Sequence, residues 1–199
     1  DIYSLSDLQR DDRGNIYVSP DGNIAKDNTV GDILLGSTFP KSNMSWRNSF
    51  GYKGVNLDVL LAARFGGVVY SSTQSFLDYY GVSEQSALDR DNGGVMVNGT
   101  DLISPEIYYR TNNSAQYYTY SADNIRLQEV ALGYTIPKSV FNNKAELSLS
   151  LIGRNLLMIY KKAPFDPEAT ATTGNYYQGM YYFMSPSTQN FGFNVRLKF

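Results

Sequence analysis

Asp166 and Glu168, on either side of Pro167, are the residues that come nearest to a catalytic pair. Two carboxylates are what most glycoside hydrolases use, one as acid and the other as base or nucleophile. Histidine is the commonest general base near neutral pH, and the sequence contains none, so hydrolysis by a Ser-His-Asp triad is excluded. A carboxylate-dependent enzyme is the catalytic possibility that these residue types leave open.

Two short segments crowd carboxylates and glycine in the way that calcium-binding loops do. They run from Asp11 to Asn15 and from Asp89 to Gly94. Neither completes the EF-hand pattern with its closing glutamate, so we favour ordinary turns rich in aspartate and asparagine. The usual zinc, copper and iron–sulfur sites are excluded because Cys and His are both absent. We therefore expect no metal site and no cofactor.

Composition limits the class of protein further. Of 199 residues, 42% are hydrophobic and 18% charged, and the net charge of -2 comes with no run of Lys or Arg, so we expect no nucleic-acid partner. No apolar stretch reaches the ~18 residues that a membrane-spanning helix needs. The 17 Tyr and 10 Phe suit strands, interfaces and binding loops. Transmembrane strands of ~10 alternating residues are compatible with this composition.

The end of the sequence has the period of a β-strand. Phe191, Phe193, Val195, Leu197 and Phe199 alternate with small, polar or charged residues, which puts apolar side chains on one face. Four other segments show the same alternation. We predict five strands of about 11 residues, long enough to cross a bilayer at a steep tilt. They lie at about 43–53, 55–65, 125–136, 144–154 and 189–199.

The predicted connections alternate between short and long. Gly54 separates the first two strands and residues 137–143 the third and fourth, whereas the segments 1–42, 66–124 and 155–188 are long. Short periplasmic turns and long extracellular loops are the plan of an outer-membrane barrel, whereas soluble β-sandwiches usually have short connections. Because a barrel needs at least ~8 strands, we predict an all-β fold that is one piece of a larger antiparallel transmembrane β-barrel, with a soluble β-sandwich as the alternative.

A series of motifs follows in one order along the sequence. These are SFGYKG at 49–54, GGVVY at 66–70, NIRLQEVALGYTIPK at 124–138, LIGRNL at 151–156, FDPE at 165–168, GNYYQG at 174–179 and PSTQNFGFN at 186–194. Together with the terminal Phe199, their order and spacing resemble the C-terminal barrel portion of SusC-like (RagA-type) TonB-dependent outer-membrane transporters. Each motif alone is weak, and the co-linear set carries the resemblance.

The resemblance implies a barrel of roughly 22 strands in the outer membrane of a Gram-negative bacterium, with a plug domain and a TonB box that this chain lacks. It implies import of glycan or peptide oligomers, with a SusD-like lipoprotein as partner, TonB as the source of force, and membrane lipid around the wall. The residues from Phe191 to Phe199 resemble the signal that the barrel assembly machinery reads. The motif also explains Asp166 and Glu168 without catalysis, so we expect no enzyme. A soluble, non-enzymatic glycan-binding or adhesin β-sandwich is the alternative.

The last long connection is rich in tyrosine. Its tyrosines are Tyr160, Tyr176, Tyr177, Tyr181 and Tyr182, and Gly174 and Gly179 would allow close backbone approach. Aromatic rings with polar tips suit either sugar rings or a protein lid, and packing of the loop against itself is a third possibility. We predict these tyrosines as candidates for contact with substrate or lid.

Overall fold

The computed structural model forms two compact units, and it describes residues 1–27, 29, 31–112, 114–142, 144–171, 174 and 177–199. We call the first the mixed unit; it consists of Asp1–Phe39, Gly67–Ser121 and Thr170–Met184. The second, the sheet unit, consists of Pro40–Gly66, Ala122–Ala169 and Ser185–Phe199. Each unit is built from segments that are far apart in the sequence.

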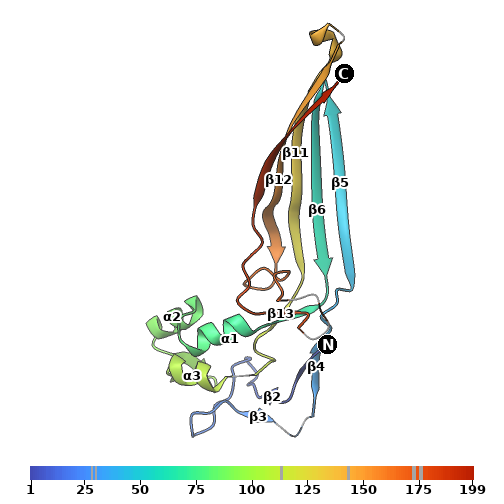
Figure 1. Ribbon diagram of the computed structural model, residues 1–199. Helices are drawn as coiled ribbons and strands as arrows, with labels where there is room; N and C mark the ends of the chain where they lie inside the picture. Colours follow the sequence, from blue (N-terminus) through green and yellow to red (C-terminus); the bar gives the residue numbers. More distant parts are fainter. Residues whose placement is uncertain (28, 30, 113, 143, 172–173, 175–176) are drawn as a thin grey trace. The chain divides into compact units, whose positions relative to one another are not determined.

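The sheet unit is one five-stranded antiparallel sheet with the order β14-β12-β11-β6-β5 (Figure 1). Its strands are β5 (Ser42–Tyr52), β6 (Val55–Phe65), β11 (Asn124–Ile136), β12 (Glu146–Lys161) and β14 (Asn190–Lys198). Apolar and polar residues alternate along these strands. Because successive side chains of a strand point to opposite faces, the alternation gives the sheet one apolar and one polar face. The predicted all-β class is confirmed, and the sheet in this chain is open.

The pairing register places both short connections at one end of the sheet. Tyr52 pairs with Val55 and Val55 with Tyr134, so the β5–β6 turn lies beside the end of β11. Lys53 and Gly54 have φ values of 46° and 87°, as a two-residue hairpin turn requires. Figure 1 shows the carboxy-terminal end of β14 near the same end of the sheet.

The two faces of the sheet have opposite chemistry. One row across all five strands is Phe50, Leu57, Leu132, Leu151 and Phe193, each paired with the next. The neighbouring row on the other face is Gly51, Asn56, Gly133, Ser150 and Asn194. Apart from the half-buried Leu57, the apolar row is exposed, with Phe193 at 79% and Leu151 at 66% of their accessible surface. Such a face is unfavourable in water and favourable in hydrocarbon.

β12 is longer than the sequence predicted. Its pairing with β11 runs from Leu147 to Lys161, whereas the predicted strand ended at residue 154. Asn155 has a left-handed φ of 51° and lies where the register shifts, so a bulge carries the strand past the GRN sequence that looked like its end. The prediction that 155–188 is all loop is therefore wrong for residues 155–161.

The mixed unit contains the helices α1 (Ser72–Tyr79), α2 (Glu84–Asp91) and α3 (Pro105–Thr111). Its short strands pair as β1–β4, β2–β3 and β8–β9, and as a sheet of order β10-β7-β13. Their bounds are β1 Ile2–Ser4, β2 Asp7–Leu8, β3 Lys26–Asp27, β4 Ile33–Gly36, β7 Val68–Ser71, β8 Val95–Val97, β9 Asp101–Ile103, β10 Thr119–Ser121 and β13 Met180–Tyr181. Within the described residues, no helix has both the length and the apolar character that crossing a membrane requires.

The long connections, predicted as extracellular loops, contain short helices and strands. The helices were missed because they are short, yet their start signals are present in the sequence. The Ser71 hydroxyl accepts a hydrogen bond from the Gln74 backbone N–H at the start of α1, and Ser83 accepts one from Ser86 at α2. Pro105 opens α3. A core then forms around Leu8, Ile16, Ile24, Val97, Tyr108 and Tyr109.

Candidate functional site

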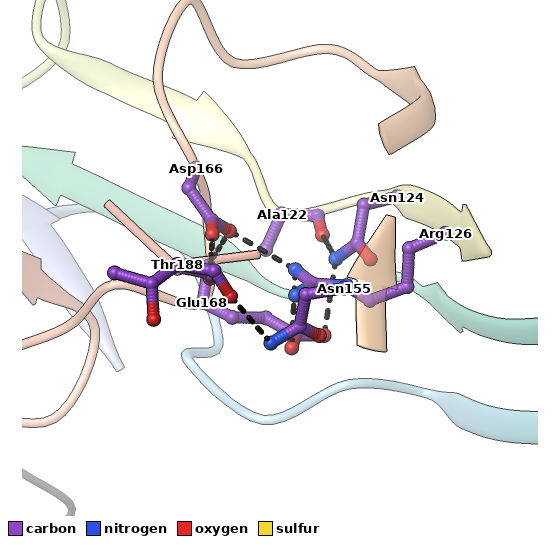
Figure 2. A network of polar contacts seen from close by, with 8 residues as sticks. Ala122, Asn124, Arg126, Asn155, Asp166, Glu168 and Thr188 are labelled. Carbon is purple, nitrogen blue, oxygen red and sulfur yellow. Dashed lines mark hydrogen bonds and ion pairs between the residues drawn. The ribbon is translucent and has the colours of Figure 1, made fainter. Parts of the chain in front are cut away.

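A buried arginine near the start of β11 organises a polar network in the sheet unit (Figure 2). Arg126 is only 7% exposed. Its Nη2 lies 3.0 Å from Asp166 Oδ1 and 3.2 Å from Glu168 Oε2. A buried guanidinium is costly unless it is paired, and here one nitrogen meets both carboxylates.

Further hydrogen bonds fasten the same loop segment. Asn124, also buried, donates from Nδ2 to the Ala122 carbonyl at 3.1 Å and to Glu168 Oε1 at 3.4 Å. The backbone N–H of Glu168 donates to Asp166 Oδ1 at 3.0 Å, and the Ser187 hydroxyl donates to Asp166 Oδ2. The loop base from Asp166 to Glu168 is thus fixed to the beginning of β11.

The electrostatics of this network do not suit acid catalysis. Burial by itself would raise the pKa of Asp166, but hydrogen bonds from Ser187 and the Glu168 backbone, together with the charge of Arg126, hold it below its ordinary value. A general acid in glycoside hydrolysis needs a raised pKa. Asp166 therefore stays ionised, and the arrangement is suited to holding a loop in place.

A second group of polar contacts, around Asp123, connects the ends of three strands. The Asp123 carboxylate accepts hydrogen bonds from the Gly66 backbone N–H and from Lys162 Nζ, the latter at 2.8 Å. Gly66 follows β6, Asp123 precedes β11 and Lys162 follows β12. The end of the sheet from which the long connections depart is thus held by side chains as well as by backbone pairing.

The predicted tyrosines are distributed over both units. Tyr160 lies on β12 in the sheet unit, not in a loop, and is 41% exposed. Tyr177 and Tyr182 belong to the mixed unit and are 58% and 50% exposed, whereas Tyr181 is half-buried in β13. Tyr176 lies outside the described residues. Gly179 has a φ of 78°, and a Cβ there would meet Thr38 Cγ2 at 2.5 Å, so the backbone at this glycine packs closely against Thr38.

Tyr182 belongs to an exposed aromatic cluster that the sequence did not single out. Its ring centroid lies 5.2 Å from that of Phe183 and 6.2 Å from that of Phe76. Phe183 has a φ of 46°, a conformation that bulky residues rarely adopt, and its backbone N–H donates to Thr73 Oγ1 at 2.6 Å. The strained backbone keeps these rings at the surface, and the run MYYFM at 180–184 was the available signal.

The predicted assembly-signal residues all lie along the last strand and its end. Phe191, Phe193, Val195, Leu197 and Phe199 are exposed, from 52% to 84%. β14 pairs with β12 on one side, and β5 pairs with β6 on one side, so both form edges of the sheet. Such long edges are aggregation-prone unless another strand covers them.

The two acidic segments turn out to be different structures. Asp11 forms an Asx turn, accepting from the backbone N–H of Arg13 and of Asn15. Asp89 is not in a turn as predicted but in α2, where it accepts hydrogen bonds from Gln85 and Tyr109. Among the residues that the structure describes, no group of three or more potential metal ligands comes together.

The chain resembles known proteins in both sequence and fold. No family model matches the chain. The chain is 26% identical over 198 residues to "TonB-dependent receptor P3" of Formosa agariphila, covering 95% of this chain and 19% of that protein. The RagAB peptide importer has a similar fold, with TM-scores of 0.70 in the "open-open" state and 0.65 in the "closed-closed" state.

The structural likeness extends over 98% of this chain and 22% of the importer chain, at 18% and 19% identity. The chain therefore spans about a fifth of the length of the proteins it matches. The shared fold agrees with the motifs in the sequence and with the two-faced antiparallel sheet. In sequence the chain is thus similar to a TonB-dependent receptor, and in fold it is similar to the RagAB importer.

Proposed function

We propose that this chain forms part of the wall and the outer loops of a TonB-dependent transporter that imports peptide or glycan oligomers across the outer membrane. The observation that carries the proposal is the sheet, whose five strands expose an apolar row on one face and a polar row on the other. An outward apolar band and a polar interior are what a transmembrane barrel requires. The free edges of β5 and β14 are where further strands would continue the wall.

The extracellular side would be the end from which the long connections depart. A SusD-type lipoprotein is the partner we propose there, because the sequence motifs resemble a family that works with such a lid and because the fold is that of the RagAB importer. The cluster of Phe76, Tyr182 and Phe183 is a candidate contact for lid or substrate, since aromatic residues are enriched at binding interfaces. The Arg126 network would keep the base of that loop in place during transport.

Cysteine labelling tests the orientation of the sheet, because the chain has no cysteine of its own. We expect Leu132→Cys and Leu151→Cys in the full-length protein to resist a water-soluble maleimide in intact outer membranes. Gly133→Cys and Ser150→Cys, their neighbours on the polar face, should be labelled when the lumen is open to water. Equal labelling of both faces would overturn the wall assignment and favour the β-sandwich alternative.

Uptake itself is tested in cells. Deletion of the gene for the full-length protein should abolish growth on the oligomer that it imports, and removal of TonB should have the same effect. Growth that persists without TonB would contradict the proposed mechanism.

A further inference from the structure

The three short helices of the mixed unit enclose a pocket of about 230 Å³ that the transport proposal does not use. Its walls come from the end of α1, from α2 and from one side of α3. Pockets for drug-sized ligands are usually larger, ~300–1,000 Å³. The volume therefore suits one ring or one side chain of a larger ligand.

Aromatic rings form one wall of this pocket. The ring centroids of Tyr79 and Tyr80 lie 5.1 Å apart in an edge-to-face arrangement, and Tyr80 is 69% exposed. Tyr109 is almost fully buried, and its hydroxyl donates to Asp89 Oδ2 at 2.6 Å. The exposed ring of Tyr80 thus lies in the same pocket as the buried, hydrogen-bonded ring of Tyr109. Such a wall suits a flat or compact ligand group.

Two arginines supply the charge of the pocket. Arg110 Nη1 lies 2.9 Å from Glu106 Oε1, and its guanidinium carbon lies 5.9 Å from the centroid of the Tyr79 ring. Arg90 Nη1 donates to the Gly81 carbonyl at 2.9 Å. Each guanidinium is held through one nitrogen and, with five N–H donors, keeps others for a ligand.

The arginine donors select the kind of ligand. The lining carries two guanidinium groups and one carboxylate, that of Glu106. A second carboxylate, Asp89, lies beside the lining, where it accepts from Gln85 Nε2 and from Tyr109. The preference therefore comes from the remaining N–H donors of the two arginines, and a carboxylate matches the fork of an arginine side chain.

We propose that this pocket binds a carboxylate-bearing group of the imported oligomer, so that the transporter selects acidic over neutral substrates. The identity of the ligand as part of an imported oligomer rests on the proposed function, whereas the carboxylate preference rests on the pocket. Acidic sugar residues and acidic amino-acid residues share this chemistry. In either case the carboxylate meets Arg90 and Arg110 while the rest of the residue lies against Tyr80.

Calorimetric titration of the full-length protein, purified in detergent, tests the proposal with two matched pairs of probes. The first pair is galacturonic acid and galactose; the second is N-acetylglutamic acid α-amide and N-acetylglutamine α-amide. We expect at least one acid to bind at least ~10-fold more tightly than its neutral partner, since hydrogen bonds to charged groups exceed those to neutral ones by about that factor. The acid that binds more tightly identifies the source of the carboxylate.

Variants complete the test. Arg90→Gln should weaken binding of the acid by ~10-fold or more, and Arg90→Lys should weaken it less, because the charge remains and the fork is lost. Arg13→Gln removes an exposed arginine of the same unit outside the pocket and should leave binding unchanged. Unchanged hydrogen exchange in α2 and α3 would show that Arg90→Gln folds.

Two results would overturn the inference: equal affinity for acid and neutral probe in both pairs, or an Arg90→Gln protein that binds the acid like the wild type. Failure of the transport proposal gives a different pattern. Acid-selective binding without TonB-dependent uptake would leave the pocket intact and contradict transport. TonB-dependent uptake with equal affinity for acid and neutral probes would contradict only the pocket.

Discussion

The two units of this chain place their apolar residues in opposite ways. In the mixed unit, Leu8, Ile16, Ile24, Val97 and Tyr108 are buried in a core, as in proteins that fold in water. In the sheet unit the only buried hydrophobic residues among those described are Ala122 and Ala163, and many large ones, such as Leu132 and Phe193, are exposed. The mixed unit thus buries its apolar side chains in a core of its own, whereas the sheet unit leaves them to be covered by an apolar environment.

The largest effect should come from the core of the mixed unit. Tyr108→Ala removes a buried ring and should destabilise that unit by about 3–5 kcal/mol, because a cavity replaces its contacts. Hydrogen exchange of the full-length protein should show faster exchange in α3 and in the strands around it. Tyr177→Ala, at an exposed position, should change exchange little. Equal effects of the two substitutions would show that Tyr108 does not belong to a packed core.

Charge on the apolar face should have the next largest effect. Leu132→Arg should destabilise the folded protein in lipid by about 2–4 kcal/mol if the face meets the bilayer centre. Ser150→Arg, on the polar face, should cost well under half of that. Urea unfolding of the protein in lipid vesicles, followed by mobility on gels without heating, measures both. If protein and not lipid covers the apolar face, Leu132→Arg should instead clash with the packed side chains and prevent assembly of the folded protein.

Acid should act on the two units in opposite directions. Asp166 has a lowered pKa, so its contribution is present above the ordinary value of 3.8 and is lost as pH falls through the lower, folded value. Burial raises the pKa of Asp78 in the mixed unit, against hydrogen bonds from Ser83 and Gln74. Ionisation of Asp78 therefore costs stability as pH rises through its folded value.

Two variants follow from these opposite signs. Asp78→Asn should make α1 exchange more slowly at neutral pH, while Asp166→Asn should expose the segment after residue 168 to proteases at neutral pH. Below the folded pKa of Asp166, pepsin should cleave the wild type and Asp166→Asn at similar rates. If Asp166→Asn were as resistant as the wild type at neutral pH, the Arg126 network would not hold the loop.

The smallest effect should come from the exposed ion pairs on the polar face. Glu129 meets Arg47 at 3.2 Å and Arg154 at 2.9 Å, and both arginines are more than half exposed. Exposed pairs contribute about 0–1 kcal/mol. Glu129→Gln should therefore shift the urea midpoint little, and the shift should vanish in high salt. A large, salt-independent shift would mean that this face is dry and packed.

The sheet could be predicted from the sequence because period-2 alternation is a local signal. It places Leu57, Leu132 and Phe193 on one face before any partner strand is known, and the pairing puts them in one row. The end of β12 could not be predicted in this way. Gly153, Arg154 and Asn155 read as a strand end, yet pairing with β11 continues beyond a bulge, and the partner strand decides that.

The candidate sites depend on contacts between residues that are distant in the sequence. Arg126 and Asp166 are separated by 40 positions, and no local pattern predicts that pair. Phe76 meets Phe183 across more than half the chain, and only the aromatic run at 180–184 hinted at it. The helical pocket was missed because each of its helices has eight residues or fewer, too short for a clear helical period.

Asp166 lies at the beginning of the long loop that follows β12, and it accepts a hydrogen bond from Ser187 at the end of that loop. Its ion pair with Arg126 fixes both ends to β11. Because Asp166 and Ser187 are hydrogen-bonded to each other, the two ends of this loop are held together whatever residues lie between them. Closing a longer stretch adds only ~0.6 kcal/mol per doubling of its length. Residues 169–186 can therefore be lengthened, shortened or grafted from a relative with little effect on the sheet, so binding preference can diverge while the wall stays constant.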